Sequence, residues 1–499
     1  RDPRDISKHS VSVRGGNNGI LDGRAAAVGH GDNSAWRASV SRRADDGYDE
    51  PFEGEIRPDR KRIETLNSEW LWEVDDRNTF SVQAGGSQSW LERQPESGVA
   101  AIGNYTHDPV QQGEKAFLSL EWQHVFSATH QLKLSTYGQY SNEATGFGVC
   151  YLDPFTGQPG PGGGLLFSRE LRELYLQNGG DTGATFSAVP SSAAVLSRYG
   201  TLQGAVGNFC ADSELDLQEE RYDLEVQDTW QINERLRLVS GANLRHDRVS
   251  SDTYLSGTED NISYRLFGNL AVDVLSPLTL NLGGYWERDQ ISGEHFSPRG
   301  GVSWRVAPSH TLRYVYSRAV RTPDIYEDQA HTNIEAMEMS QPFASNPNGL
   351  LGWSPAYFFI TQSSPGTLKP EKIRSEEVGY YGQFRYLELD VRYFQEELTD
   401  LLSHALNPFE FEPNNEGWVN HQGTEAQLTF RPTVNHLLRL TGAHIHTHTN
   451  KKTESRIAAR DSGSVLWAWQ FASRWGLSTA YYQANDYNDY RYQRADLQI

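Results

Sequence analysis

The strongest constraint on the fold of this chain is a strict alternation of apolar and polar residues that recurs along the sequence in long runs. In the run 62–74, alternate positions carry the apolar residues Leu66, Trp70, Trp72 and Val74, with the polar residues Thr65, Asn67, Glu69 and Glu73 between them. Further runs cover 221–232, 264–274, 278–286, 312–316, 387–393 and 465–471. A period of two places successive side chains on opposite faces of a strand, so the chain is predicted to be all-β. Most of these strands exceed the roughly five or six residues usual in soluble proteins.

The connections between the runs alternate between tight turns and long segments. Tight turns are expected at 75–78, 127–130, 232–235, 276–277, 307–310 and 431–435. Long segments are expected at 45–61, 91–112, 142–214, 247–260, 320–373, 397–416 and 449–461. This alternation places all tight turns at one end of an up-and-down meander, as in outer-membrane barrels with short periplasmic turns and long external loops. Counting the hairpins gives about twenty strands.

The composition favours strands that cross a membrane. Only 37% of the residues are hydrophobic and the mean hydropathy is −0.63, yet 11% of the residues are aromatic. The sequence has no run of roughly 18 uncharged apolar residues, which excludes a helical membrane protein. A soluble array of short strands, such as a propeller, would show a per-blade repeat that this sequence lacks. The net charge of −20 makes nucleic acid a poor partner.

Three motifs give the chain a family resemblance. They are SPRGGVSWRVAPSHTLRYVYSRAVRTPDIYE at 297–327, LKPEKIRSEEVGYYG at 368–382 and NHQGTEAQLTF at 420–430. Their order and spacing resemble the barrel signatures of TonB-dependent outer-membrane receptors. The opening RDPRD resembles the residues that follow the junction between plug and barrel in that family.

The resemblance implies a large antiparallel transmembrane up-and-down β-barrel of about 22 strands, of which about 20 are counted in this chain. Residues 1–499 would form the barrel domain. The family's N-terminal plug is then expected before Arg1, and about two further strands are expected after Ile499.

The resemblance also implies a receptor in the outer membrane of a Gram-negative bacterium that imports a scarce, bulky nutrient. A ferric siderophore is the first expectation, followed by another metal chelate or a cobalamin-like nutrient. The implied partners are the TonB energy-coupling protein, reached through the plug, and outer-membrane lipid and lipopolysaccharide. The receptor is expected to be a monomer without a cofactor. Two alternatives stay open from the residues alone, a passive porin-like diffusion channel and a carbohydrate-binding β protein.

The substrate is expected to bind to aromatic and cationic residues at the bases of the external loops. A concave mouth lined by rings and a few fixed charges suits a large polar chelate. The alternative is that these side chains only pack their own loops. The candidates are Tyr151, Arg198, Arg321, Tyr326 and Trp353.

The only two cysteines, Cys150 and Cys210, both fall in the longest connection, 142–214, which also contains the segment GQPGPGGG. The periplasm through which such a chain passes is oxidising. We therefore expect Cys150 and Cys210 to form one disulfide that restrains this loop.

Three histidines, His444, His446 and His448, occupy alternate positions and would lie on one face of a strand. Such a pattern invites a metal site, because imidazole is a common ligand. The same face carries Leu438 and Leu440. The histidines are therefore expected to continue the outward row into the girdle of amphipathic rings at the membrane boundary.

The only methionines, Met337 and Met339, lie in the segment 320–373 beside Glu335 and Glu338. Thioethers suit Cu(I), but two ligands do not complete a site, so no metal site is predicted. No enzymatic activity is expected either. The sequence lacks the G-x-S-x-G, H-E-x-x-H, P-loop and C-x-x-C motifs.

Overall fold

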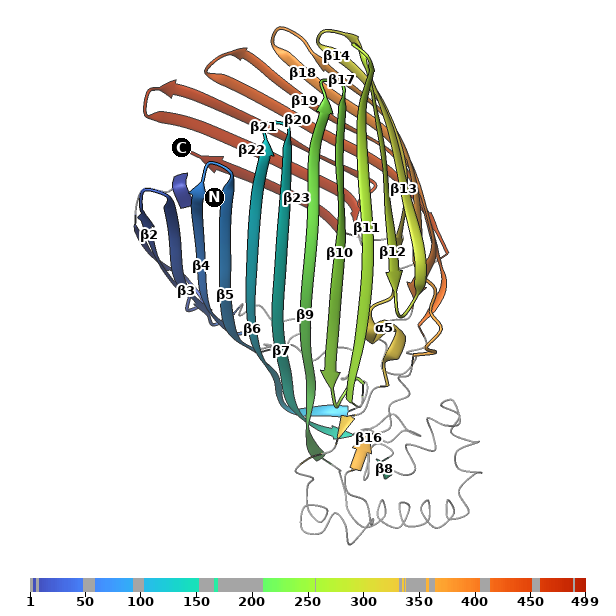
Figure 1. Ribbon diagram of the computed structural model, residues 1–499. Helices are drawn as coiled ribbons and strands as arrows, with labels where there is room; N and C mark the ends of the chain where they lie inside the picture. The colour runs from blue at the N-terminus through green and yellow to red at the C-terminus, as the bar shows by residue number, and fades with distance from the viewer. Residues whose placement is uncertain are drawn as a thin grey trace.

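The structure, a computed structural model, describes residues 3–5, 9–47, 59–92, 103–151, 166–168, 210–255, 257–331, 334–335, 337, 356–358, 364–403, 413–450, 458–487 and 490–499. Within these ranges, twenty antiparallel strands form one sheet that curves round on itself, with β4–β11 in the near wall and β18–β22 behind it (Figure 1). The all-β meander of about twenty strands is confirmed.

Once the three short strands β8, β15 and β16 are set aside, each strand of this sheet pairs with its neighbours in the chain: β1 pairs with β2 and β23 with β22, and every strand between them pairs with the one before and the one after it. The strands are β1 (Ser10–Gly15), β2 (Leu21–His30), β3 (Ser34–Asp45), β4 (Lys61–Asp75), β5 (Asn78–Glu92), β6 (Gly103–Ser127), β7 (His130–Tyr151), β9 (Cys210–Asn233), β10 (Leu236–Ser251), β11 (Gly257–Leu275), β12 (Leu278–Asp289), β13 (Gly293–Ala307), β14 (His310–Arg321), β17 (Glu371–Gln383), β18 (Leu387–Ser403), β19 (Asn414–Thr433), β20 (His436–Thr449), β21 (Asp461–Ala472), β22 (Trp475–Tyr487) and β23 (Tyr490–Gln498).

The remaining elements are small. Strands β8 (Leu166–Ser168), β15 (Ile334–Glu335) and β16 (Ala356–Phe358) form a separate three-stranded sheet, and the 3-10 helix η1 (Pro3–Asp5) precedes β1. The α-helix α5 (Ile325–Gln329) follows β14. Among the described residues, no helix combines the length and the apolar character that a membrane crossing requires.

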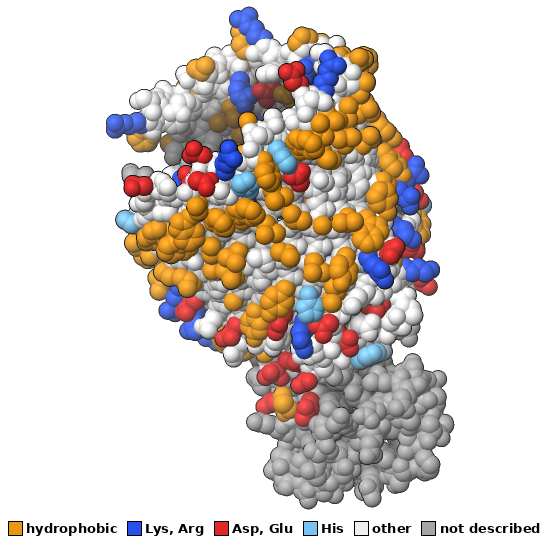
Figure 2. Space-filling model, viewed as in Figure 1, with side chains coloured by type: hydrophobic (Ala, Val, Ile, Leu, Met, Phe, Trp, Pro, Cys, Tyr) orange, Lys and Arg blue, Asp and Glu red, His pale blue; other side chains and the backbone are white. Residues whose placement is uncertain are grey.

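The side chains that the alternation predicted to be apolar and outward are exposed in the structure. Leu66 is 56% exposed, and Trp70 and Trp72 are 39% exposed each. The Trp70 ring stacks on those of Trp36 and Trp72, at centroid distances of 5.7 and 5.8 Å. Figure 2 shows that hydrophobic side chains gather in a band across the near wall, with charged side chains toward its two ends. The band has the arrangement that the sequence pattern predicts for a membrane-spanning barrel, with apolar residues outward between two charged ends.

The tight turns lie where the sequence placed them. Two-residue turns join β4 to β5, β6 to β7, β9 to β10, β11 to β12, β13 to β14 and β19 to β20. The predicted turn 75–78 is fixed by Asp75, whose carboxylate accepts hydrogen bonds from the backbone N–H groups of Arg77 and Asn78, both at 2.8 Å. Such side-chain to backbone bonds are the usual reason that Asp favours turns. All six turns join the same ends of their hairpins.

The prediction of a long connection at 247–260 is wrong. Strand β10 continues to Ser251 and β11 begins at Gly257, with these two residues paired in the ladder. The turn between them is capped from the adjacent strand β9 by Asp216, whose carboxylate accepts from the backbone N–H groups of Asp252 and Thr253 at 2.9 and 2.8 Å. The polar residues at 247–260, for which the sequence predicts a loop, therefore belong to a β-hairpin. The Asp216 carboxylate, on another strand, holds its turn in place.

Other boundaries also differ from the prediction: β6 begins at Gly103, inside the predicted connection 91–112, and β18 extends to Ser403, inside the predicted connection 397–416. The connection 290–292 between β12 and β13 is short, although it lies at the end where long loops were expected. There the Asp289 carboxylate accepts from the backbone N–H groups of Ile291 and Ser292, both at 2.9 Å. The ladder between β7 and β9 also runs into the predicted segment 142–214, as far as the pair of Cys150 and Cys210.

We predict that the two ends of the barrel face different compartments. Cysteines introduced at Ala128 and Pro308, in the tight turns, should not react with a membrane-impermeant maleimide on intact cells, whereas a cysteine at Asp252 should react. All three should react after permeabilisation, which is the control for local accessibility. Labelling at Ala128 or Pro308 in intact cells would contradict this topology.

Candidate functional site

The short segment that follows β14 folds back over the inner face of the wall and closes a small chamber. The chamber has a volume of about 320 Å³ and lies between the inner faces of β9–β12 and residues 322–326. Helix α5 lies at the end of the barrel opposite the six two-residue turns (Figure 1).

The sequence RTPDIYED explains why a helix begins here. Asp324 caps it by accepting from the backbone N–H of Glu327 at 2.7 Å, and the Glu327 carboxylate accepts in return from the backbone N–H of Asp324 at 2.9 Å. This reciprocal capping box satisfies two backbone donors that a helix start leaves open. Pro323, which is fully buried, fixes the chain just before the cap.

Apolar packing fixes α5 against the wall. Ile325 is 5% exposed and packs with Val249 of β10 and Leu255 of the following turn. The ring of Tyr326 meets that of Tyr254 edge to face, with centroids 5.2 Å apart. Burying a residue such as Ile325 contributes roughly 1.5–3 kcal/mol toward holding this short helix against the wall.

Arg321, at the end of β14, ties the same segment to the sheet by charge. Its guanidinium donates to both Glu327 carboxylate oxygens at 3.0 Å, and it also donates to the Glu371 carboxylate at the start of β17. Bidentate arginine to carboxylate pairs are directional as well as strong. In this arrangement Arg321 connects α5, β14 and β17.

The inner wall of the chamber is a grid of paired charges. Asp247 accepts from Arg221 at 2.7 Å and pairs with Arg245 at 2.6 Å. One strand further along, Arg265 donates to Glu287 at 2.8 Å. Arg221 lies directly opposite Asp247, and Arg265 lies directly opposite Glu287, so the sheet register creates these two pairs, whereas Arg245 lies two residues before Asp247 on the same face of β10.

Two side-chain oxygens in this wall have no hydrogen-bond partner among the described residues. They are Oδ1 of Asn261, which is 8% exposed, and Oγ of Ser263, which is 2% exposed. The orientation of the Asn261 amide is set by its Nδ2, which donates to the acceptor-only carboxylate of Asp289 at 2.8 Å. A buried unpaired acceptor is costly, so a donor group from water or from a bound molecule in the chamber would stabilise these two oxygens.

Of the five predicted substrate residues, the structure brings two to this region. Tyr326 lines the chamber, and Arg321 holds the segment that covers it. Tyr151 ends β7, and nothing is described of its side chain, while Arg198 and Trp353 lie outside the described residues. Their roles in binding stay predictions.

The sequence reasoning missed the polar residues beneath α5, namely Asn261, Ser263 and Asp289. Asn261 and Ser263 alternate with the outward residues Ile262 and Tyr264, so they continue the period-two pattern of the predicted run 264–274, which did not reach them. No local signal showed that α5 would cover them, because that contact joins residues about sixty positions apart.

The two cysteines are opposite each other in the ladder. Cys150 of β7 is paired with Cys210 of β9. Directly opposed residues of antiparallel strands have Cα atoms about 4.5–5.5 Å apart, within the range that a disulfide spans. The register is therefore compatible with the predicted bond.

The histidines of β20 lie on the outward face, as the alternation predicted. His444, His446 and His448 are exposed. Nδ1 of His444 is hydrogen-bonded to the Asp461 carboxylate at 2.6 Å, and the His448 ring meets Trp418 edge to face. Among the described residues, no three His, Cys, Asp or Glu side chains converge as metal ligands. The backbone of Met337 forms an isolated antiparallel β-bridge with that of Asp212, and Met339 lies outside the described residues.

Comparison with known proteins agrees with this architecture. A family model described as "TonB dependent receptor-like, beta-barrel" matches residues 7–498. No curated protein sequence matches the chain.

Solved structures resemble the chain in fold. The copper transporter OprC is 13% identical with a TM-score of 0.63, over 97% of this chain and 68% of its own. The ferric-catecholate import receptor Fiu from E. coli K12 is 9% identical with a TM-score of 0.65, over 99% and 75%. The siderophore receptor PirA from Acinetobacter baumannii is 10% identical with a TM-score of 0.61, over 98% and 72%.

The disulfide can be tested by counting thiols. Titration of the unreduced, denatured protein should find no free thiol, and the Cys150→Ser variant should expose one. If the bond forms, it closes a loop of about sixty residues and stabilises the folded state by roughly 4 kcal/mol on the loop-entropy estimate. Two free thiols in the unreduced wild-type protein would refute the pairing.

The cap of α5 should respond to pH. Partial burial raises the pKa of the Asp324 carboxyl, with the Glu327 carboxylate adding to the rise and the Arg321 guanidinium opposing it. Because the folded-state pKa of Asp324 is raised, its contribution to the stability of the α5 cap is complete below the unfolded pKa of about 3.9. That contribution is lost as the pH rises through the folded-state pKa. Asp324→Asn can still cap the helix and does not titrate, so it should remove this loss.

The measurement is hydrogen exchange of the α5 backbone amides, expressed as a protection factor at several pH values between about 3 and 7. Wild-type protection should fall with rising pH, and Asp324→Asn should flatten the profile. The Asp76→Asn variant, in an exposed tight turn, is the control and should leave the profile unchanged. An α5 profile that is the same in wild type and Asp324→Asn would exclude Asp324 as its source.

Proposed function

The chain belongs to the TonB-dependent receptor family, whose barrel model matches residues 7–498, and from this premise we propose that it imports a ferric siderophore across the outer membrane of a Gram-negative bacterium. The family consists of transporters and receptors. The barrel presents an apolar band outward and a polar wall inward, as transport through an outer-membrane barrel requires.

The observation that carries the proposal is the polar chamber beneath α5. Its wall combines guanidinium donors, carboxylates and the unpartnered acceptors of Asn261 and Ser263. Such a mixture suits a ligand that presents both oxygen acceptors and hydroxyl donors, because each buried polar group then finds a partner. A ferric siderophore has this chemistry.

The substrate class also draws on the structural neighbours. Two of them carry the descriptions ferric-catecholate import receptor and siderophore receptor, and a third is described as a copper transporter. They support a metal chelate as the cargo. They resemble this chain in fold alone, so the identity of the chelate is left to experiment.

The mechanism we propose involves no covalent chemistry. The external end of the barrel captures the chelate, and a plug inside the lumen rearranges when the TonB protein of the inner-membrane energy complex pulls on it. The charged side chains of the lumen wall, such as Arg221, Asp247 and Arg265, would contact that plug. Outer-membrane lipid and lipopolysaccharide surround the outward band.

Transport is tested with a deletion strain and a panel of iron, copper, cobalamin and glycan sources. The strain should lose growth on one ferric siderophore and recover it with the wild-type gene. Uptake of the radiolabelled chelate should stop when the proton gradient is collapsed with an ionophore. Uptake that continues without the gradient would identify a passive channel instead.

Binding is tested with the full-length receptor and the siderophore that the growth panel identifies. Tyr326→Ala should weaken equilibrium binding by about tenfold, because Tyr326 lines the chamber. Arg321→Ala should also weaken it, by releasing α5 from Glu327 and Glu371. Tyr264→Ala, on the outward face, is the matched control and should bind like wild type.

Heat-resistant electrophoretic mobility verifies that each variant barrel has folded. Unchanged affinity in folded Tyr326→Ala and Arg321→Ala would remove both residues from the site.

A further inference from the structure

The wall of the chamber beneath α5 holds a buried carboxylate that no cation neutralises. Asp289, the last residue of β12, is 4% exposed and has no ion pair among the described residues. Its Oδ1 accepts from the backbone N–H groups of Ile291 and Ser292 at 2.9 Å and from the Ser292 hydroxyl at 3.1 Å. Its Oδ2 accepts only from Nδ2 of Asn261, so it keeps an acceptor position open toward the chamber. A buried charge in this situation is costly unless a cation joins it.

The two unpartnered oxygens of the chamber belong to the neighbours of Asp289. Ser263 lies opposite Asp289 in the register of β11 and β12, and Asn261 is bonded to it. Oγ of Ser263 and Oδ1 of Asn261 therefore add two acceptors to the one on Asp289. A primary ammonium has three N–H donors and no acceptor, so it matches this set in number and in kind.

The arginines of the same wall are already compensated. Arg245, opposite Ser263, pairs with Asp247 at 2.6 Å, and Arg265 donates to Glu287 at 2.8 Å. Acidic residues also outnumber basic ones around the chamber. The acidic residues of the lining are Glu219, Glu220, Asp247, Asp289 and Asp324, and the basic residues are Arg221, Arg245 and Arg265.

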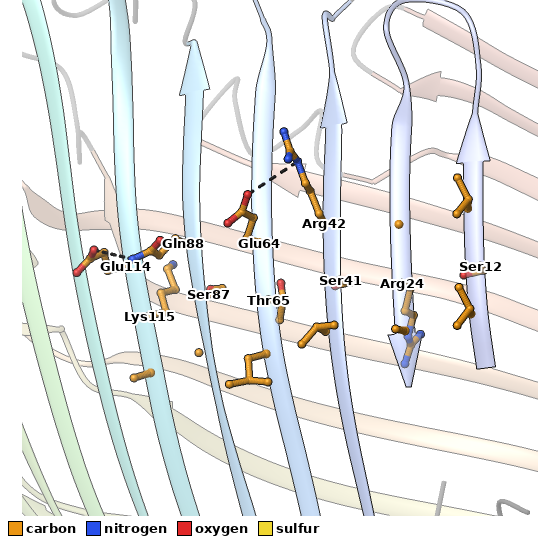
Figure 3. Close-up of a pocket in the computed structure, with 18 of the residues that line it drawn as sticks. Ser12, Arg24, Ser41, Arg42, Glu64, Thr65, Ser87, Gln88, Glu114 and Lys115 are labelled. Carbon is orange, nitrogen blue, oxygen red and sulfur yellow. Dashed lines mark hydrogen bonds and ion pairs between the residues drawn. The ribbon is translucent and has the colours of Figure 1, made fainter. Parts of the chain in front are cut away.

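A larger hollow on the outward face shows the more usual state of a carboxylate. It has a volume of about 840 Å³ and lies on β1–β7. Figure 3 shows Glu64 directed toward Arg42, at 3.8 Å, and Glu114 toward Gln88, whose Nε2 donates to it at 3.2 Å. The Glu64 side chain is 46% exposed, so solvent as well as Arg42 stabilises its charge.

Two further hollows also lack an uncompensated buried carboxylate. In one of about 650 Å³ in the lumen wall, Asp390 pairs with Arg313 and Glu425 pairs with Arg392. In the other, of about 850 Å³ on the outward face of β7 and β9–β12, the lining contains no acidic residue. The combination of a buried carboxylate and two unpartnered oxygens therefore distinguishes the chamber from these hollows.

The size of the chamber suits one arm of a larger molecule. Its volume of about 320 Å³ is at the lower end of the roughly 300–1,000 Å³ of ligand pockets, so it fits part of a bulky chelate. A calcium ion fits less well, because it takes about six to eight oxygen ligands and this cluster offers three.

We propose that Asp289, Asn261 and Ser263 bind a primary ammonium group on an arm of the transported chelate, and that the receptor thereby prefers a chelate with a cationic arm to its neutral counterpart. The ammonium donates to Oδ2 of Asp289, Oδ1 of Asn261 and Oγ of Ser263. The preference among chelates rests on the proposed function, whereas the ammonium site can be tested without any chelate.

The first test uses full-length receptor in detergent and two small probes, n-pentylammonium chloride and its neutral analogue n-pentanol. Saturation-transfer NMR titrations measure their binding. Wild-type protein should bind pentylammonium at least tenfold more tightly than pentanol. Ser263→Ala should weaken pentylammonium binding by about tenfold, as expected for the loss of a hydrogen bond to a charged group.

Asp289→Asn should weaken pentylammonium binding by more than tenfold, because it removes the charge. This variant also alters the acceptor that holds the turn 290–292, so Ser263→Ala, which removes an unpartnered hydroxyl, is the safer variant for folding. The matched control is Asp273→Asn, which removes a carboxylate from the same face of β11 near its tight turn, away from the chamber. It should bind pentylammonium like wild type, and heat-resistant electrophoretic mobility verifies each fold.

The second test measures equilibrium binding of a linear ferric trihydroxamate with a terminal primary amine and of the same chelate with that amine acetylated. Wild-type receptor should prefer the free amine at least tenfold. Ser263→Ala and Asp289→Asn should reduce this preference to about twofold, and Asp273→Asn should leave it unchanged.

Several outcomes would overturn the ammonium site. They are equal binding of pentylammonium and pentanol, unchanged pentylammonium binding in folded Ser263→Ala and Asp289→Asn, and an equal loss in Asp273→Asn. Displacement of pentylammonium by a lower concentration of calcium chloride would assign the cluster to a metal ion instead. A wild-type receptor that binds both chelates equally, or neither, would refute the preference.

The two proposals fail separately. If the growth panel identifies a ferric siderophore but pentylammonium does not bind, the ammonium site is refuted and the uptake proposal stands. If pentylammonium binds through Ser263 and Asp289 but no ferric siderophore supports growth through this receptor, the uptake proposal fails and the ammonium site stands.

Discussion

The pairing of backbone hydrogen bonds is the constraint on which the rest of this structure depends. In the apolar interior of a bilayer, each unpaired N–H or C=O group costs several kcal/mol, so a membrane-crossing sheet has to satisfy them by strand-to-strand ladders. Here the ladders run without interruption from β1 to β23 through twenty strands. The two-residue turns keep neighbouring strands in register, and the register then determines which side chains meet on each face.

The register has opposite effects on the two faces. Inward, it places arginines against carboxylates, as in the pairs of Arg265 with Glu287 and of Arg221 with Asp247, where the charges compensate one another. Outward, it places rings beside rings, as in the Trp36, Trp70 and Trp72 stack. A sheet one residue thick therefore separates two environments, and the parity of a position determines which environment its side chain meets.

The fold was predictable from the sequence because period two is a local property. Residues such as Leu66, Trp70 and Tyr222 could be assigned to the outward face, and turns such as 75–78 could be located, from neighbouring residues alone. The chamber could not be located in this way, since it forms only when Ile325 reaches Val249 on a strand far back in the chain. The error at 247–260 has the same origin, because Asp216 caps that turn from another strand.

The attachment of α5 has a mechanical consequence. The helix is packed on β10 through Val249 and joined to β14 and β17 through Arg321, while the strands between them, β11 to β13, lie on the arc that it spans. The helix therefore links β10 directly to β14 and β17, on either side of β11 to β13, and this link restrains the local curvature of the wall. The packing of Ile325 and the ion pairs of Arg321 thus oppose any flattening of this part of the sheet.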